Sequence, residues 1–182
     1  NAVSEKIETL DFVGNLKNNV SNKSRLGIQY TSLKLFVDNP IKGVGFGQQA
    51  YEARGKYPYW STSKNYEFEL YYNNKNDKSF APGYNMYTRL LAELGIIGFL
   101  IFVTLLYSMF KKSKRIFLHN KDRLINILGI TILVTIVGIF INWMQIDTFR
   151  IFGFWLCLSI IIIANNNEQN NSNSINESVS KF

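Results

Sequence analysis

The chain has 182 residues, a formal net charge of +7 and 47% hydrophobic residues. The mean hydropathy of the chain is close to zero. This average hides a division between a polar region, residues 1–85, and a mostly apolar region, residues 94–164. The only cysteine, Cys157, excludes a disulfide framework within the chain and predicts a small buried hydrophobe, and the only histidine, His119, excludes a histidine-rich metal cluster.

We expect an all-α membrane protein: the C-terminal part of a multi-pass helical bundle with a large, partly helical extracytoplasmic loop. The chain starts Asn-Ala-Val, without an initiator Met, a basic n-region or an apolar h-region that could deliver a polar loop to a membrane. The expected segments are an extracytoplasmic loop (1–85), a transmembrane helix (86–110), a cytoplasmic basic loop (111–123), a transmembrane helix (124–143), a short outer loop (144–147), a transmembrane helix (148–164) and a disordered cytoplasmic tail (165–182).

The first clear element of the loop is a helix that ends at Asn39 and Pro40. Three polar residues are candidate N-caps: Ser21, Asn22 and Ser24. Four apolar residues then share one helical face: Leu26, Tyr30, Leu33 and Val37. Arg25 lies in the first turn, where a cation opposes the helix dipole, so its position suggests an anionic partner.

A glycine-rich stretch follows, with Gly43, Gly45 and Gly47. It is not a dinucleotide-binding motif, because Gln48 stands where the pattern needs glycine and a helix precedes it instead of a strand. Glycines at this density let the backbone turn its N–H groups toward an anion. A plain glycine-rich turn explains the composition equally well.

Residues 51–84 are dense in aromatic side chains, which suit either stacking on sugars or an interfacial belt against lipid headgroups. The alternation from Tyr66 to Leu70 has the period of a strand, with Glu67 and Glu69 on one face. Two such carboxylates could bind a metal or do acid–base work, although a solvated strand face is the commoner arrangement.

The apolar region begins with residues 94–110, which carry no charge and, at about 1.5 Å per residue, span most of a ~30 Å hydrocarbon layer. Arg89 and Glu93 stand four residues apart just before it, on one helical face. Two interpretations remain open: an ion pair at a helix mouth, or the wall of an active site.

The predicted orientation of the chain in the membrane follows from the loop at residues 111–123, which has six Lys or Arg residues and one Asp. Short basic loops remain in the cytoplasm, so residues 1–85 are predicted to lie on the outer side. Cytoplasmic ATP and nucleotide sugars cannot reach that side, so a substrate must arrive already activated or attached to lipid.

Two motifs together resemble the O-antigen polymerase and ligase family of membrane glycosyltransferases. They are Arg25 and its helix followed by D-N-P-I-K-G-V-G-F-G at 38–47, and Y-N-M-Y-T-R-L-L-A-E-L-G-I-I-G at 84–98. The resemblance covers about residues 21–110. It implies a bacterial plasma-membrane location, an oligosaccharide donor on undecaprenyl pyrophosphate, and no metal or other cofactor. The expected partners are this lipid-linked donor, the bilayer and other polysaccharide-assembly membrane proteins, with no nucleic acid.

The family often has His before Asn in the second motif, where this chain has Tyr84. This difference favours a polymerase for capsule, exopolysaccharide or O-antigen; the alternatives are an O-antigen ligase and a non-enzymatic flippase or transporter of lipid-linked glycans. The resemblance assigns pyrophosphate binding to Arg25, and we expect Arg89 as a second clamp. Tyr84 would orient an acceptor hydroxyl, and Glu93 would orient Arg89 or receive the acceptor proton. Substrate binding is assigned to Gly43, Gly45, Gly47 and Asn85.

Overall fold

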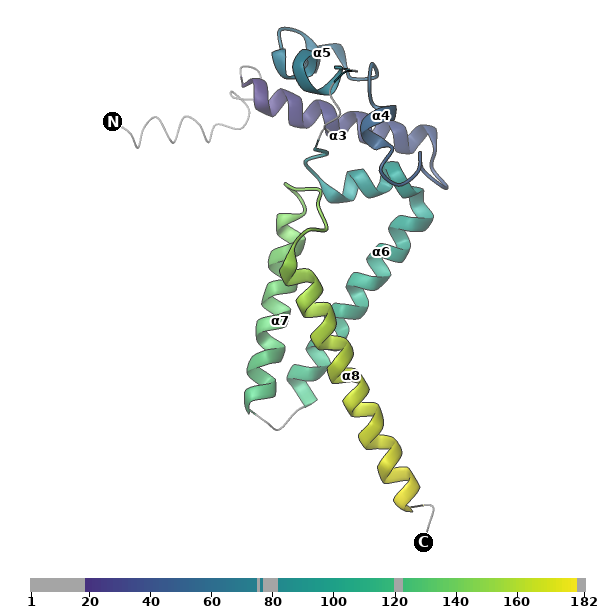
Figure 1. Cartoon of the computed structure of the whole chain (residues 1–182), viewed down its shortest axis with the longest axis vertical. Coiled ribbons are helices and arrows are strands. Elements are labelled where there is room, and N and C mark those ends of the chain that lie inside the picture. Colours follow the sequence, from purple (N-terminus) through teal and green to yellow (C-terminus); the bar gives the residue numbers. More distant parts are fainter. Residues whose placement is uncertain (1–18, 75, 77–81, 120–122, 180–182) are drawn as a thin grey trace, which may run out of the picture. The chain divides into compact units, whose positions relative to one another are not determined.

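The computed structural model describes residues 19–74, 76, 82–119 and 123–179 (Figure 1). The N-terminal part of the predicted loop, residues 1–18, lies outside the described residues. Every regular element in the described part of the chain is a helix, so the predicted all-α class is confirmed. The chain divides into two compact units, which we call unit 1 (residues 1–100 and 144–147) and unit 2 (residues 101–143 and 148–182).

Unit 1 is built around α3 (Val20–Asp38). The helix begins earlier than predicted, because the N-cap is Asn19, whose side-chain oxygen accepts a hydrogen bond from the Ser21 amide at 3.0 Å. It ends where predicted, with Asn39 as the C-cap directly before Pro40. Its N-terminal turns therefore carry Arg25 in a fixed helical position.

The buried face of α3 is not the apolar face that the sequence pattern located. The buried residues are mainly small or polar, namely Ser24, Gly27, Ile28, Thr31, Ser32 and Leu35. Two amides from other segments explain this inner face: Gln49 Nε2 donates to Ser32 Oγ at 2.8 Å, and Asn65 Nδ2 donates to Ser24 Oγ at 2.9 Å. A hydroxyl-rich face can be buried because its donors and acceptors are paired there.

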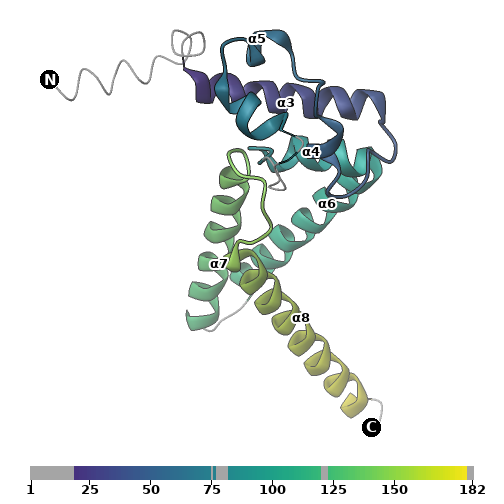
Figure 2. The ribbon, with the colours of Figure 1, turned by 45° about the horizontal axis from the view of Figure 1, so that its top comes forward.

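The remaining helices of the polar region are short: α4 (Gln49–Glu52), α5 (Tyr59–Thr62) and η1, a π-helix (Phe68–Tyr72). Both α4 and α5 pack against α3 (Figure 2). The strand predicted over 66–70 is wrong, because η1 occupies most of it. Phe68 and Tyr72 then both face the core, where their ring centroids lie 5.1 Å apart. Helical spacing of four residues brings these two rings together. In a strand, Phe68, Leu70 and Tyr72 would all lie on one face, with Leu70 between the two rings.

The helix α6 (Met86–His119) contains a break that the sequence analysis did not predict. Gly95 has φ +63° and ψ −166°, so the α-helical path stops and resumes there. The segment after α3 bridges this break: Val44 N donates to Ala92 O and Gly45 N to Glu93 O, both at 2.9 Å, while Ile96 N donates to Pro40 O at 2.8 Å. Backbone groups freed by the break are thus paired within unit 1.

Unit 2 contains the rest of α6, α7 (Arg123–Asn142) and α8 (Phe152–Val179). Trp143 is fully buried, with ring centroids 5.5 Å from Phe102 and 5.2 Å from Phe154. Its indole Nε1 donates to Thr148 O at 3.0 Å, so the polar edge of the ring is satisfied. Cys157 is buried, as predicted.

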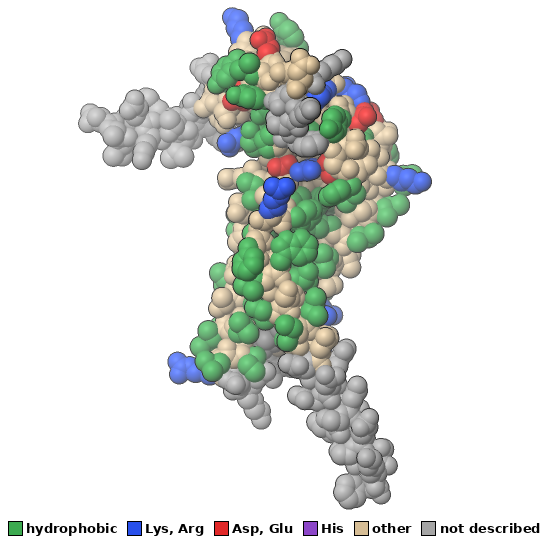
Figure 3. Space-filling model, viewed as in Figure 1, with side chains coloured by type: hydrophobic (Ala, Val, Ile, Leu, Met, Phe, Trp, Pro, Cys, Tyr) green, Lys and Arg blue, Asp and Glu red, His purple; other side chains and the backbone are tan. Residues whose placement is uncertain are grey.

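Two helices are long and apolar enough to cross a membrane, Met86–Arg115 and Arg123–Asn142. Within the described part of the chain, 33% and 22% of their apolar windows are buried, so most of each apolar surface is uncovered there. Hydrophobic side chains are spread over the visible surface of unit 2 (Figure 3). The third predicted span corresponds to a shorter apolar helix, Phe152–Asn166.

Two boundaries differ from the sequence-based expectation. The predicted basic loop is largely helical, because α6 continues to His119. In the same way, α8 continues to Val179 through the Asn- and Ser-rich segment for which composition predicts disorder. Both extensions are possible because a helix pairs its backbone groups internally and needs no apolar face to do so.

Candidate functional site

An open pocket of about 290 Å³ lies in unit 1, between the N-terminal half of α3 and two connecting segments. Its lining combines amides, one guanidinium and apolar groups, contributed by Asn22, Arg25, Leu26, Gln29, Tyr84, Met144 and Gln145. The structure therefore brings together Arg25 and Tyr84, two of the predicted site residues, although 59 positions separate them in the sequence. Such a mixture of polar and apolar lining suits an amphipathic ligand.

Arg25 supplies the positive charge of this pocket. Its guanidinium carbon lies 5.1 Å from the centroid of the Tyr84 ring, within the range of a cation–π contact. No carboxylate forms an ion pair with Arg25 within the described residues, and the side chain is exposed. The five guanidinium N–H donors are thus accessible to an anionic ligand.

Tyr84 has an unusual backbone conformation, and its hydroxyl contacts a neighbouring tyrosine. Its φ of +56° is uncommon for a residue with a side chain, and its hydroxyl lies 3.0 Å from that of Tyr72. Burial, together with the hydrogen bond to Tyr84, raises the pKa of Tyr72 far above its ordinary value. The Tyr84 ring is therefore a fixed floor beneath the Arg25 guanidinium.

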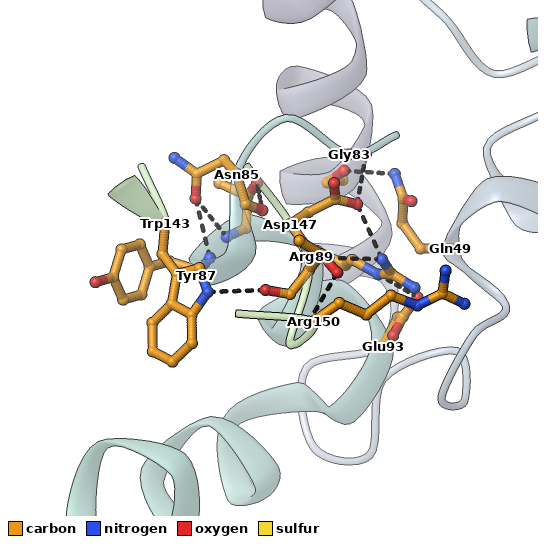
Figure 4. Close-up of polar contacts among 12 residues, drawn as sticks. Gln49, Gly83, Asn85, Tyr87, Arg89, Glu93, Trp143, Asp147 and Arg150 are labelled. Atoms are coloured by element: carbon orange, nitrogen blue, oxygen red, sulfur yellow. Dashed lines mark hydrogen bonds and ion pairs between the residues drawn. The ribbon is translucent and has the colours of Figure 1, made fainter. Parts of the chain in front are cut away.

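Arg89 has a different environment, which Figure 4 shows. Its Nε donates to Glu93 Oε1 at 3.0 Å, and its Nη1 donates to both the side-chain Oδ2 and the backbone oxygen of Asp147 at 2.9 Å. The contact with Glu93 follows the predicted spacing of four residues. Since two carboxylates already surround this guanidinium, it is poorly available to a further anion.

Glu93 is only 1% exposed, and its second oxygen, Oε2, has no hydrogen-bond partner among the described residues. A buried carboxylate oxygen without a partner is costly, so the neighbouring Arg89 is needed to keep this side chain in place. Burial also separates Glu93 from the open pocket, whose lining does not include it. This position fits the predicted role of orienting Arg89 better than proton transfer.

Asp147 is the residue that the sequence analysis missed. Its Oδ2 accepts from the Gly83 amide at 2.7 Å as well as from Arg89, so it joins the short loop 144–147 to the segment before α6. The available signal was a lone carboxylate between two apolar segments. Its partner could not be identified from the sequence, because 58 residues separate Asp147 from Arg89.

Asn85 and the glycine-rich stretch have structural partners in place of the predicted ligand. Asn85 Oδ1 accepts from the amides of Tyr87 at 3.0 Å and Thr88 at 3.1 Å, which makes it an N-capping residue of α6. The Gly43 amide donates to Asn39 O, and the next two amides donate to the carbonyls at the break of α6. The expected anion cradle therefore does not form from the amides of residues 43–45.

The pocket lies next to the cluster formed by Arg89, Glu93 and Asp147, because residues of the same two segments belong to both. Tyr84 lines the pocket while its neighbours Gly83 and Asn85 hold loop 144–147, and Met144 lines the same pocket. The cluster thus fixes two walls of the pocket that contains Arg25. No group of three potential metal-ligating side chains occurs in the part of the chain that the structure describes.

Comparisons of the chain with protein-family models, curated proteins and solved structures find no match.

Proposed function

We propose that the chain belongs to a polysaccharide polymerase of the bacterial plasma membrane. It would join oligosaccharide repeat units carried on undecaprenyl pyrophosphate, for capsule, exopolysaccharide or O-antigen. The observation that carries the proposal is Arg25, an accessible guanidinium without a carboxylate partner among the described residues, in a pocket with a tyrosine floor. The motif resemblance assigns pyrophosphate binding to the same residue.

The proposed location is the outer face of the membrane. It is supported by two helices that are long and apolar enough to cross a bilayer, and by the cluster of Lys and Arg residues at 111–123 between them. Unit 1, with its pocket, then lies on the side where lipid-linked oligosaccharides are presented. The remaining lining residues, such as Gln29 and Leu26, offer both hydrogen bonds and apolar contact to a sugar ring.

In the proposed reaction, an acceptor hydroxyl oxygen forms a bond to the anomeric carbon of the donor while the bond from that carbon to the phosphate oxygen breaks. Undecaprenyl pyrophosphate leaves with the bonding electrons, so negative charge builds on its phosphate, and the acceptor hydroxyl releases its proton to the surrounding water. An arginine fork matches phosphate oxygens in two places at once, which a lysine cannot do. Arg25 would stabilise this leaving group in the transition state.

The other site residues take supporting roles. Tyr84 would orient the acceptor or the Arg25 side chain, since its ring lies beneath the guanidinium. Arg89, which the sequence predicts as a second pyrophosphate-binding arginine, is assigned to holding loop 144–147 with Asp147 and Glu93. Asn85 and Gly43 belong to the framework, because their polar groups bond to the backbone.

The test is Arg25→Lys in the full-length protein in its native membrane. We expect polymer to fall at least about tenfold while the amount of protein remains unchanged, because the charge stays but the bidentate geometry is lost. Lys42→Ala is the matched control, since Lys42 is an exposed cation of unit 1 that does not line the pocket. Polymer would be measured by gel electrophoresis of the extracted polysaccharide. Undiminished polymer in Arg25→Lys would remove Arg25 from the mechanism.

A further inference from the structure

The face of α3 opposite its buried side is apolar along most of the helix. Leu26, Tyr30, Leu33 and Val37, which we call the outer stripe, are 36%, 53%, 43% and 71% exposed. Their spacing of four, three and four residues places them on one side of a helix with 3.6 residues per turn. A stripe of this kind is the face that a helix ordinarily buries.

The outer stripe is exposed because another face of α3 forms the core of unit 1. Ile28 and Leu35 supply that core together with the small residues between them, and Gly27 permits the close approach of α5, since a Cβ there would overlap Ser61. The helix thus has two apolar faces, and the described elements of the chain cover only one. The second face needs an apolar environment from outside the described part of unit 1.

Charged and aromatic residues beside the outer stripe indicate the nature of that environment. Cations flank it, contributed by Lys23, Arg25 and Lys34, and the only acidic residue of α3 is its last, Asp38. Trp60 stands edge-on to Tyr30 at 6.3 Å and is 48% exposed. Basic side chains beside apolar ones, with Trp and Tyr at the edge, are typical of helices at the surface of anionic bilayers.

The C-terminal end of α3 adjoins the candidate membrane span within unit 1. Pro40, two residues after α3 ends, accepts a hydrogen bond from Ile96 N at 2.8 Å. On either side of this bond, Ile41 is 59% exposed and Ile97 is 53% exposed. The C-terminal end of α3 is therefore attached to the first exposed apolar turn of α6 after its break.

We propose that the outer stripe of α3 lies in the boundary between headgroups and acyl chains of a bilayer that contains anionic lipids. The four apolar side chains would enter this layer, Trp60 would lie at its surface, and Lys23 and Lys34 would contact lipid phosphates. The arrangement brings the rim of the pocket, where Leu26 belongs to both features, to the level of the headgroups. The inference does not depend on glycosyl transfer.

The experiment uses the full-length protein in vesicles of phosphatidylethanolamine and phosphatidylglycerol. Single cysteines at Leu33 and Val37, in a Cys157→Ser background, carry an environment-sensitive fluorophore; Lys56→Cys, an exposed position after α4, is the matched control. Lipids with a nitroxide near the headgroup are expected to quench positions 33 and 37 at least about threefold more than position 56. Aqueous iodide is expected to show the opposite order.

Two results would overturn the inference. If iodide quenches the labels at 33 and 37 as strongly as the label at 56, the outer stripe faces water. If neither quencher reaches the two labels, protein covers the stripe. Repeating the measurement with phosphatidylcholine as the only lipid tests the charge: weaker nitroxide quenching supports the anionic contact, and equal quenching excludes it.

Discussion

Arg25 and Arg89 lie in the same unit, and each comes from the early turns of a helix, yet their environments are opposite. Arg25 is exposed above the Tyr84 ring and has no carboxylate partner among the described residues. Arg89 contacts two carboxylates at 2.9–3.0 Å, one of which is almost fully buried. The comparison teaches that carboxylate neighbours decide whether the donors of an arginine are occupied within the fold or remain accessible.

The largest expected difference is in stability. Arg89→Ala leaves the buried Glu93 without its cation, and we expect it to lower the free energy of unfolding by about 3–5 kcal/mol. Arg25→Ala removes an exposed side chain and should change it by less than about 0.5 kcal/mol. Denaturation of both purified variants in the same detergent measures the difference. Equal losses would mean that Arg25 is also part of the framework.

A smaller effect is expected at high pH, where the aromatic core should weaken while arginine stays charged. Burial raises the pKa of Tyr57 to about 12, although Arg54 acts in the opposite direction. Folded Tyr57 therefore keeps a proton that the unfolded chain begins to lose at pH 10. Its contribution is complete below pH 10 and is lost as pH rises to 12, by about 2–3 kcal/mol.

Tyr57→Phe removes the titrating hydroxyl and tests this dependence. We expect the variant to lose less stability than the parent protein between pH 10 and pH 12 in chemical denaturation, with Tyr72 still contributing in the same direction because its pKa is also raised. Parallel curves for parent and variant would show that Tyr57 ionises as readily in the folded protein as in the unfolded chain.

The smallest expected loss of stability tests the contact between Arg89 and Asp147. Asp147→Asn keeps the shape of the side chain but removes its charge, and we expect a loss of about 1–2 kcal/mol because two charge-assisted hydrogen bonds weaken. Glu52→Gln is the matched control, since the Glu52–Lys56 pair is exposed and should change stability by less than about 0.5 kcal/mol. Thermal unfolding of both variants would detect the contrast, and an Asp147→Asn loss no greater than that of the control would contradict it.

Local patterns in the sequence predicted local features correctly. Asn39 and Pro40 marked the end of α3, and uncharged runs located the two candidate spans, because a proline or a continuous apolar segment acts within its own neighbourhood. The contact between Arg89 and Glu93 followed from helical spacing.

Features that depend on distant partners could not be predicted. Periodicity located one apolar face on α3 but not the face that is buried, since burial of the second face depends on Gln49 and Asn65, which bond to its small hydroxyls. Likewise, Gly95 resembled an ordinary glycine of an apolar helix. Its break requires amide donors about fifty residues earlier in the chain, at Val44 and Gly45, for the carbonyls of Ala92 and Glu93.

The interrupted helix α6 also constrains how the protein can be synthesised. The carbonyls of Ala92 and Glu93 are paired only when the segment 43–45 has reached them. An Ala92 or Glu93 carbonyl that entered the hydrocarbon layer before that point would be unsatisfied, at a cost of several kcal/mol. If α6 crosses a bilayer, its insertion is therefore coupled to the folding of the polar region translated before it.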